Sequence, residues 1–297
     1  MQLSLSDRVF KIIVYIILLV ISFCFLYPFW NSLVISFNVG SDTMRGGITF
    51  WPRQFTLENY SYVFRDTRLL RSFLISVART IIGTLLSIFF TAMFGYGMSR
   101  KELMGKKIYM ILCAITLYFS GGLIPWFLLL RSMGLMNSFW VMIVPYLINV
   151  WHMIIFRTFF QGLPEGLEEQ ASIDGCGYFG TFWRIVLPIS KPVIATLALF
   201  TAVWHWNQWF DAAIFITKDS LMPLQARLMS IINSSLLQEQ LAQMGASAAE
   251  YVGRISRVTS KSLIMATTMV AAFPVIIIYP FLQKYFTKGV MLGSIKG

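Results

Sequence analysis

Six long apolar runs limit the folds that are open to this chain. A helix needs about 20 apolar residues to cross the hydrocarbon core of a bilayer. Of the 297 residues, 57% are hydrophobic and only 12% are charged. The sequence therefore predicts an all-α membrane protein with six transmembrane helices in a single domain over residues 1–297. The runs cover approximately 12–37, 69–97, 108–130, 138–160, 191–217 and 262–283.

Charged residues gather between these runs, since a charge inside the bilayer is costly. The formal charges within the apolar limits are Arg71, Arg79, Arg157, Lys191 and Asp211, and Arg71 is close enough to an end to reach the headgroups. In a soluble protein the net charge of +11 would suggest nucleic acid. Here the basic residues flank apolar runs, so we expect membrane lipids as partners and no nucleic acid.

The first run is interpreted as a transmembrane helix. It is too long for a signal peptide and lacks a small-residue cleavage site. The short basic turn 100–107 favours a cytoplasmic position, which predicts that both termini are inside. This orientation makes 38–68 and 218–260 extracytoplasmic loops and leaves 161–190 in the cytoplasm.

Residues 164–190 have the pattern of two short helices joined by a sharp bend. Pro164 suits a first helical turn, and Glu168 and Glu169 complement the positive end of a helix dipole. Gly175 breaks the helix, and Pro188 ends the second one. A partnerless interfacial helix is the alternative, but such helices favour Lys and Arg over acids.

Residues 204–211 read Trp-His-Trp-Asn-Gln-Trp-Phe-Asp within the fifth run. These polar side chains should face protein or water rather than lipid. They form either an aromatic belt at the interface or the wall of a substrate path, where indoles stack on sugar rings. On a continuous helix Trp204, Asn207 and Asp211 share the face expected to line the path, with Asp211 at its outer gate. Trp209, with Trp206 three residues before it, would face a neighbouring helix or the edge of the path.

The third run contains Gly121 and Gly122, followed by Pro125. A helix broken inside the membrane is tolerated where it packs on protein or lines a cavity. Both interpretations stay open, and the second adds the two glycines to the substrate path. His152 has no second ligand at metal spacing, so a polar contact within the bundle is expected. Three cysteines show no disulfide or metal spacing.

Enzymatic signatures are missing from the sequence. It contains no phosphate-binding loop, no dinucleotide fingerprint and only two histidines, both inside apolar runs. We therefore expect a chain that is not an enzyme and binds neither cofactor nor metal.

The 164–192 segment also resembles the Glu-Ala-Ala loop of ABC importer permeases, although Gln170 departs from the usual Ala. The whole chain is similar to sugar permeases of the maltose-transporter type. Within them, 120–125 and 279–286 look most like the branch for oligosaccharides, including aldouronates and alginate. Asn59-Tyr60, Trp206-Asn207 and Lys296-Gly297 fit the pattern as well. The matching loop positions are Glu169, Ala171, Asp174, Gly175, Ile185, Leu187, Pro188 and Pro192.

This resemblance implies the fold of a type I ABC importer permease in a bacterial cell membrane. It also implies a second homologous permease, two ATPase subunits that hold ATP and Mg²⁺, an extracytoplasmic solute-binding protein and an oligosaccharide substrate. Permeases for amino acids, polyamines or phosphate are the nearest alternative, and a multi-spanning acyl or glycosyl transferase is a further one. The residues implied in ATPase coupling are Glu168, Glu169, Gln170, Ala171, Asp174, Gly175, Leu187 and Pro188.

Overall fold

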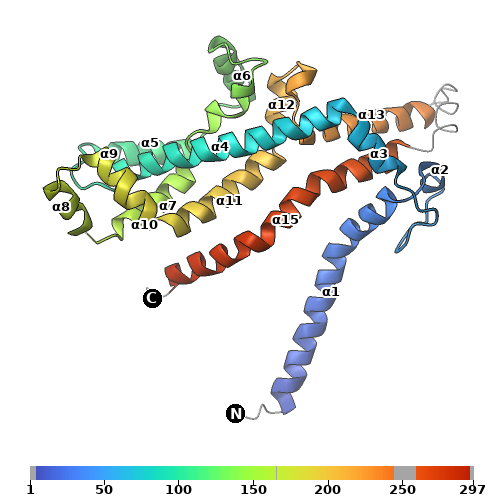
Figure 1. Ribbon diagram of the computed structural model, residues 1–297, viewed down its shortest axis with the longest axis horizontal. Helices are drawn as coiled ribbons and strands as arrows, with labels where there is room; N and C mark the ends of the chain where they lie inside the picture. The colour runs from blue at the N-terminus through green and yellow to red at the C-terminus, as the bar shows by residue number, and fades with distance from the viewer. Residues whose placement is uncertain (1–4, 165, 244–258, 295–297) are drawn as a thin grey trace. The chain divides into compact units, whose positions relative to one another are not determined.

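The computed structural model describes residues 5–164, 166–243 and 259–294, and its regular elements there are helices (Figure 1). One isolated antiparallel bridge joins Asn38 and Phe55. The chain divides into two compact units, a division that the hydropathy pattern does not predict. The first comprises residues 1–70 and 228–273, and the second comprises 71–227 and 274–297.

Three helices in the described residues are long and apolar enough to cross a membrane, and up to six spans result if each of three bent pairs counts as one. The continuous helices are α1 (Leu5–Ser36), α4 (Thr67–Ser99) and α15 (Ser260–Ser294). They cover the apolar runs 12–37, 69–97 and 262–283, and α1 and α15 extend beyond the runs by several residues. The prediction of an all-helical fold is confirmed.

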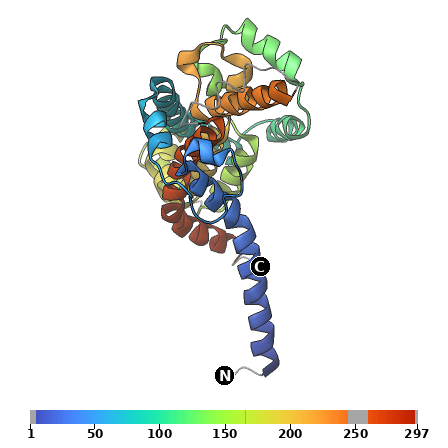
Figure 2. The same cartoon turned by 90° about the vertical axis from the view of Figure 1, so that its right-hand side faces the viewer.

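The third and fourth runs are bent rather than straight. Helices α5 (Lys106–Tyr118) and α6 (Leu123–Ser132) meet at 117°. Figure 2 shows this bend, in green, from the side. The turn passes through Gly122, whose φ of 83° is a conformation that side chains disfavour. In the fourth run the 3₁₀ turns η1 (Phe139–Met142) and η2 (Val144–Tyr146) meet α7 (Val150–Gln161) at 46°.

The fifth run is also interrupted, so the expected single helix over 191–217 is wrong. Helix α11 (Lys191–Asn207) ends before Gln208, whose ψ of 115° is extended, and the short α12 (Phe210–Phe215) follows. Periodicity alone suggested a continuous helix here. The carbonyl of Gln208 instead accepts a hydrogen bond from Arg79, and this long-range contact replaces a bond within the helix.

In the first unit the segment after α1 is ordered by buried polar contacts. It contains α2 (Gly40–Thr43) and α3 (Glu58–Arg65). The buried amide of Asn59 donates to the carbonyls of Ser36 and Asn38, both at 2.9 Å. Asp42 accepts hydrogen bonds from Asn38 and Arg53. These bonds, that from Asn38 most of all, hold the pKa of the Asp42 carboxyl below its usual value.

The expected outer loop 218–260 is partly helical. It begins with the 3₁₀ turn η4 (Asp219–Leu221), and α13 (Leu224–Gln243) follows. The apolar spacing of Leu224, Leu228 and Ile231 is typical of a helix. The small-residue stretch 245–249 lies outside the described residues.

The core of the second unit joins α4 to α7 and α11. Gly95 permits a close approach of α4 and α7, since a Cβ there would lie 2.8 Å from the Cβ of Phe156 and 3.2 Å from the carbonyl of Met153. Gly97 faces open space instead. Close packing at the end of the second run therefore depends on Gly95. The buried core residues are Ile88, Ala92, Tyr96, Phe156, Phe160, Phe182, Val186 and Leu197.

Candidate substrate pathway and coupling loop

One face of α4 holds both interrupted segments in place. Arg79, Gly83, Ser87 and Thr91 recur every four residues, so they lie in one row along the helix, which we call the α4 stripe. At one end the Thr91 hydroxyl donates to the carbonyl of Leu147 at 3.2 Å and accepts from the amide of Asn149 at 3.1 Å. These bonds satisfy backbone groups at the bend before α7, as backbone inside a membrane requires.

At the other end of the stripe Arg79 forms a buried ion pair with Asp211. The guanidinium donates to both carboxylate oxygens, at 3.2 Å for the Nη1 contact, and to the Gln208 carbonyl at 2.7 Å. The two side chains are 0% and 1% exposed. A charge-assisted pair with two parallel bonds compensates the loss of water around both groups. The pair thereby fixes the break between α11 and α12 against α4.

Between these contacts Gly83 makes room for an imidazole. A Cβ on Gly83 would lie 2.6 Å from Nε2 of His205, so any larger residue would force the imidazole to move from this position. His205 is buried, and its Nδ1 has no hydrogen-bond partner in the described residues.

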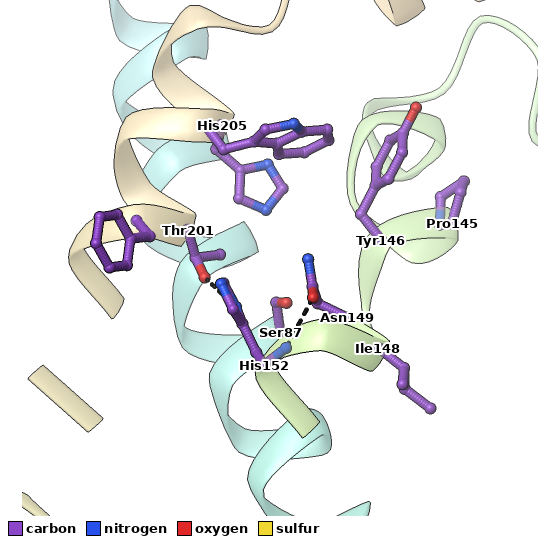
Figure 3. A pocket seen from close by; sticks show the side chains of 10 residues that line it. Ser87, Pro145, Tyr146, Ile148, Asn149, His152, Thr201 and His205 are labelled. Carbon is purple, nitrogen blue, oxygen red and sulfur yellow. Dashed lines mark hydrogen bonds between the residues drawn. The ribbon is translucent and has the colours of Figure 1, made fainter. Parts of the chain in front are cut away.

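A polar and aromatic cavity of about 250 Å³ opens beside the α4 stripe (Figure 3). At one side of the cavity the ring centres of Tyr146 and Trp204 are 4.6 Å apart. His152 Nδ1 and the Thr201 hydroxyl are 3.4 Å apart at the other. The side-chain oxygen of Asn149 accepts a hydrogen bond from the backbone amide of His152, which leaves the side-chain nitrogen of Asn149 directed into the cavity. The lining residues are Ser87, Pro145, Tyr146, Ile148, Asn149, His152, Phe200, Thr201, Trp204 and His205.

The predicted path face is not assembled as expected, because the helix ends at Asn207. Trp204 lines the cavity, whereas Asn207 is exposed and its amide donates to the Val203 carbonyl at 3.0 Å. Asp211 is sealed in its ion pair with Arg79. Trp206 is buried and contacts Phe73, and Trp209 packs on the core around α12.

Gly121 and Gly122 lie in the bend between α5 and α6 and do not line this cavity. Both are exposed, and a Cβ on Gly122 would meet nothing within 4 Å. The two glycines thus allow the backbone to turn between α5 and α6. Close packing against the described part of this chain is not the reason for glycine at these positions.

The sequence interpretation missed several residues of this region. Arg79 was noticeable, because it and Asp211 are the only charges deep within the runs and have opposite signs. Their separation of 132 positions hides the pairing from any local pattern. His152 was expected to make a polar contact within the bundle, and its contact with Thr201 confirms that expectation. Tyr146, Asn149 and Thr201 gave no signal beyond being polar inside an apolar run.

The loop after α7 forms the expected helix, bend and helix. Helix α8 (Gly166–Ile173) ends at Gly175, whose φ is 76°. The amide of Cys176 donates to the Ala171 carbonyl at 2.9 Å, which is the hydrogen bond of a Schellman C-cap. A Cβ on Gly175 would meet no atom within 4 Å. The need for glycine is therefore one of backbone conformation and not of space.

The second part of the loop continues further than expected. It comprises α9 (Tyr178–Thr181), the π-helical turn η3 (Phe182–Val186) and α10 (Leu187–Ile189). Pro188 does not end the helical path, which bends by 84° at Ser190 into α11. Phe182 and Val186, four residues apart, are buried against α4, and this anchors the loop to the bundle.

The expected coupling residues are distributed over the surface and the anchor of this loop. Glu169, Gln170, Asp174 and Pro188 are exposed, Leu187 is half-buried, and Ala171 is buried. The side chain of Glu168 lies outside the described residues. The exposed acids and Ile173 make α8 a projecting polar and apolar surface within the second unit (Figure 1).

Residues 4–292 match the family of binding-protein-dependent transport system inner membrane components. The chain belongs to this family. Members are parts of a transport system rather than enzymes, as the sequence predicted, and the family description makes the chain a membrane protein.

Relatives in this family match the chain almost end to end. A polygalacturonan/rhamnogalacturonan transport system permease protein of Bacillus subtilis is 38% identical, over 99% of this chain and 100% of its own length. The LplC protein of the same organism is 38% identical over 91% and 89%. An arabinooligosaccharides transport system permease protein of Halalkalibacterium halodurans is 28% identical over 93% of each chain.

A solved structure has the same fold. It is a crystal structure of a bacterial ABC transporter involved in the import of the acidic polysaccharide alginate. Its matching chain is 26% identical, with a TM-score of 0.85 over 96% of this chain and 99% of that one. The fold of an ABC importer permease, expected from the resemblance, is therefore confirmed.

Proposed function

We propose that this chain is the transmembrane permease subunit of an ATP-driven importer that carries carbohydrate, in the form of an oligosaccharide, into the cell by alternating access. The relatives named for polygalacturonan, arabinooligosaccharides and alginate support this substrate class. The fold and the family support the role of a permease.

The cavity beside the α4 stripe carries the proposal. Its aromatic rings, Tyr146 and Trp204, offer faces for a sugar ring, and Asn149, His152 and Thr201 offer hydrogen bonds for hydroxyls. A volume of about 250 Å³ is below the usual range of about 300–1,000 Å³ for drug-sized ligands. It suits one sugar unit of a longer chain, with the rest lying outside this cavity.

The lack of charge in the cavity lining argues against polyamines and phosphate. None of its ten lining residues is Asp, Glu, Lys or Arg. A polyamine site would need acids, and a phosphate site would need cations or a row of backbone amides. The nearby charges of Arg79 and Asp211 neutralise each other. Recognition through ring faces and hydroxyls is what this lining supports.

The proposal includes the partners that such a permease needs. They are a second homologous permease, a pair of ATPase subunits that hold ATP and Mg²⁺, and an extracytoplasmic solute-binding protein, at a bacterial plasma membrane that the chain crosses six times with both termini inside. The α8 surface would dock into the ATPase. Closure of the ATPases would move this loop, and the buried Phe182 and Val186 would transmit the movement to α4.

Trp204→Leu is expected to raise the apparent KM for oligosaccharide uptake roughly 2- to 10-fold, the loss of one aromatic contact. The measurement is uptake of a labelled oligosaccharide by proteoliposomes that contain the purified assembly. Trp151→Leu is the matched control, because Trp151 is also exposed but lies outside the cavity. Asn207→Ala should have a smaller effect than Trp204→Leu, because Asn207 does not line the cavity.

Basal ATP hydrolysis should stay normal in all three variants, since none touches the α8 loop. Unchanged uptake kinetics in Trp204→Leu, or an equal loss in Trp151→Leu, would remove this cavity from the substrate path.

A further inference from the structure

A second cavity lies at the end of α4, away from the substrate pathway. Its volume is about 410 Å³, and the residues that line it all belong to the second unit. One wall is the last turn of α4 and the turn that follows, and the other wall is the start of the second coupling-loop helix. We call it the α4–α9 groove. Its lining residues are Met93, Tyr96, Gly97, Arg100, Glu102, Leu103, Tyr178, Phe179 and Phe182.

The groove is apolar and open. Tyr178 and Phe179 are 68% and 63% exposed, although both are large aromatic residues. A Cβ on Gly97 would meet nothing within 4 Å, so the floor is also uncovered by the described residues. Apolar surface of this kind is covered in a working protein by another apolar group.

The rim of the groove is basic. The turn 100–107 contains Arg100, Lys101, Lys106 and Lys107 against the single acid Glu102. The Arg100 guanidinium lies 4.4 Å from the centre of the Tyr96 ring at the groove wall. The Lys106 ammonium donates to the Arg100 carbonyl at 3.1 Å, so it is held beside the same turn. The excess of cations favours an anionic occupant.

The end of an apolar span marks the depth at which lipid headgroups are expected, and the groove lies at such an end. The apolar span of α4 ends at Ser99, one residue before Arg100. A molecule with an apolar tail and an anionic head fits the groove. The tail would lie against the aromatic walls, and the head would lie on the basic turn. A polar protein segment would leave the apolar floor uncovered.

We propose that the α4–α9 groove binds an anionic phospholipid, with an acyl chain between Tyr96, Phe179 and Phe182 and the phosphate on the cations of the 100–107 turn. The lipid would link the end of α4 to the coupling loop. This site is separate from the sugar cavity and does not depend on the identity of the transported solute.

The test is native mass spectrometry of the intact assembly, titrated with phosphatidylglycerol and with phosphatidylcholine of the same acyl chains. Wild-type protein is expected to retain phosphatidylglycerol roughly tenfold more tightly than phosphatidylcholine, from the contribution of the basic turn. Gly97→Leu should abolish this tight binding, because its Cβ would meet nothing within 4 Å and the longer side chain would extend into the groove. Arg100→Gln should reduce the preference for the anionic lipid.

Thr158→Leu is the matched control, since it adds the same side chain at an exposed position of α7 outside the groove, and it should bind lipid as wild type does. The proposal is overturned if Gly97→Leu retains phosphatidylglycerol normally, or if phosphatidylcholine binds the wild type as tightly. It is also overturned if Gly97→Leu releases the ATPase subunits, because the groove would then be a protein interface.

Discussion

Arg79→Leu is expected to destabilise the protein by about 3–5 kcal/mol, the cost of leaving one buried charge without its partner. Asp211 would stay fully buried with no cation, and the Gln208 carbonyl would lose its donor. Asp211→Leu should cost a similar amount, because it strands the guanidinium. The measurement is the thermal unfolding midpoint of the assembly in detergent, together with its yield from the membrane.

Arg79→Met combined with Asp211→Leu is the decisive comparison. Replacing both charges by apolar groups often costs little, so the double variant should recover most of the lost stability. Recovery should be incomplete, since the Gln208 carbonyl still lacks a donor. Arg71→Leu serves as the control, because that arginine lies on the same helix but is exposed. If Arg79→Leu were as stable as Arg71→Leu, the pair would not hold the break between α11 and α12.

Gly175→Val is expected to reduce substrate-stimulated ATP hydrolysis at least tenfold, while membrane insertion stays intact. A β-branched residue is strongly disfavoured at a φ of 76°, and backbone strain of this kind costs about 1–3 kcal/mol. The chain would relieve it by opening the C-cap of α8, which moves the docking surface. The assay compares ATP hydrolysis with and without solute-loaded binding protein in proteoliposomes.

Gly177→Val is the matched control for this substitution. Gly177 has φ −72° and ψ 170°, which valine adopts easily, and its Cβ would also meet open space. It should therefore keep stimulated hydrolysis. Glu169→Lys should also abolish stimulation, because it reverses an exposed charge on α8, whereas Glu169→Gln should do so only in part. Normal stimulation in Gly175→Val and Glu169→Lys would contradict a coupling role for this loop.

The outline of the fold follows from hydropathy, because burial in a bilayer demands long apolar helices whatever their neighbours are. Both ends of α4, the last residue of α1 and the first residue of α15 were predicted to within about two residues. The start of α1 and the end of α15 lie further out than the apolar runs predicted. The C-cap at Gly175 was also predictable, since glycine after a short helix has a local cause.

The interruptions were not predictable in the same way. Helical periodicity placed Asn207 and Asp211 on one face, but that inference assumes a continuous helix. Gln208 leaves the helix because Arg79, far away in the sequence, binds its carbonyl. The cavity depends on the same kind of contact, since Thr91 of α4 fixes the bend that presents Asn149. Such contacts between distant segments carry no local signature.

Transport by the assembly isolated with this chain tests the account most directly. The chain is purified from its native membrane with its partners, reconstituted with ATP inside the vesicles and the binding protein outside, and supplied in turn with labelled oligosaccharides, amino acids, polyamines and phosphate. We predict ATP-dependent uptake of an oligosaccharide only, by an assembly that contains a second permease and an ATPase. Uptake of another solute class in place of oligosaccharide, or transport by a pure homodimer of this chain without an ATPase, would contradict the account.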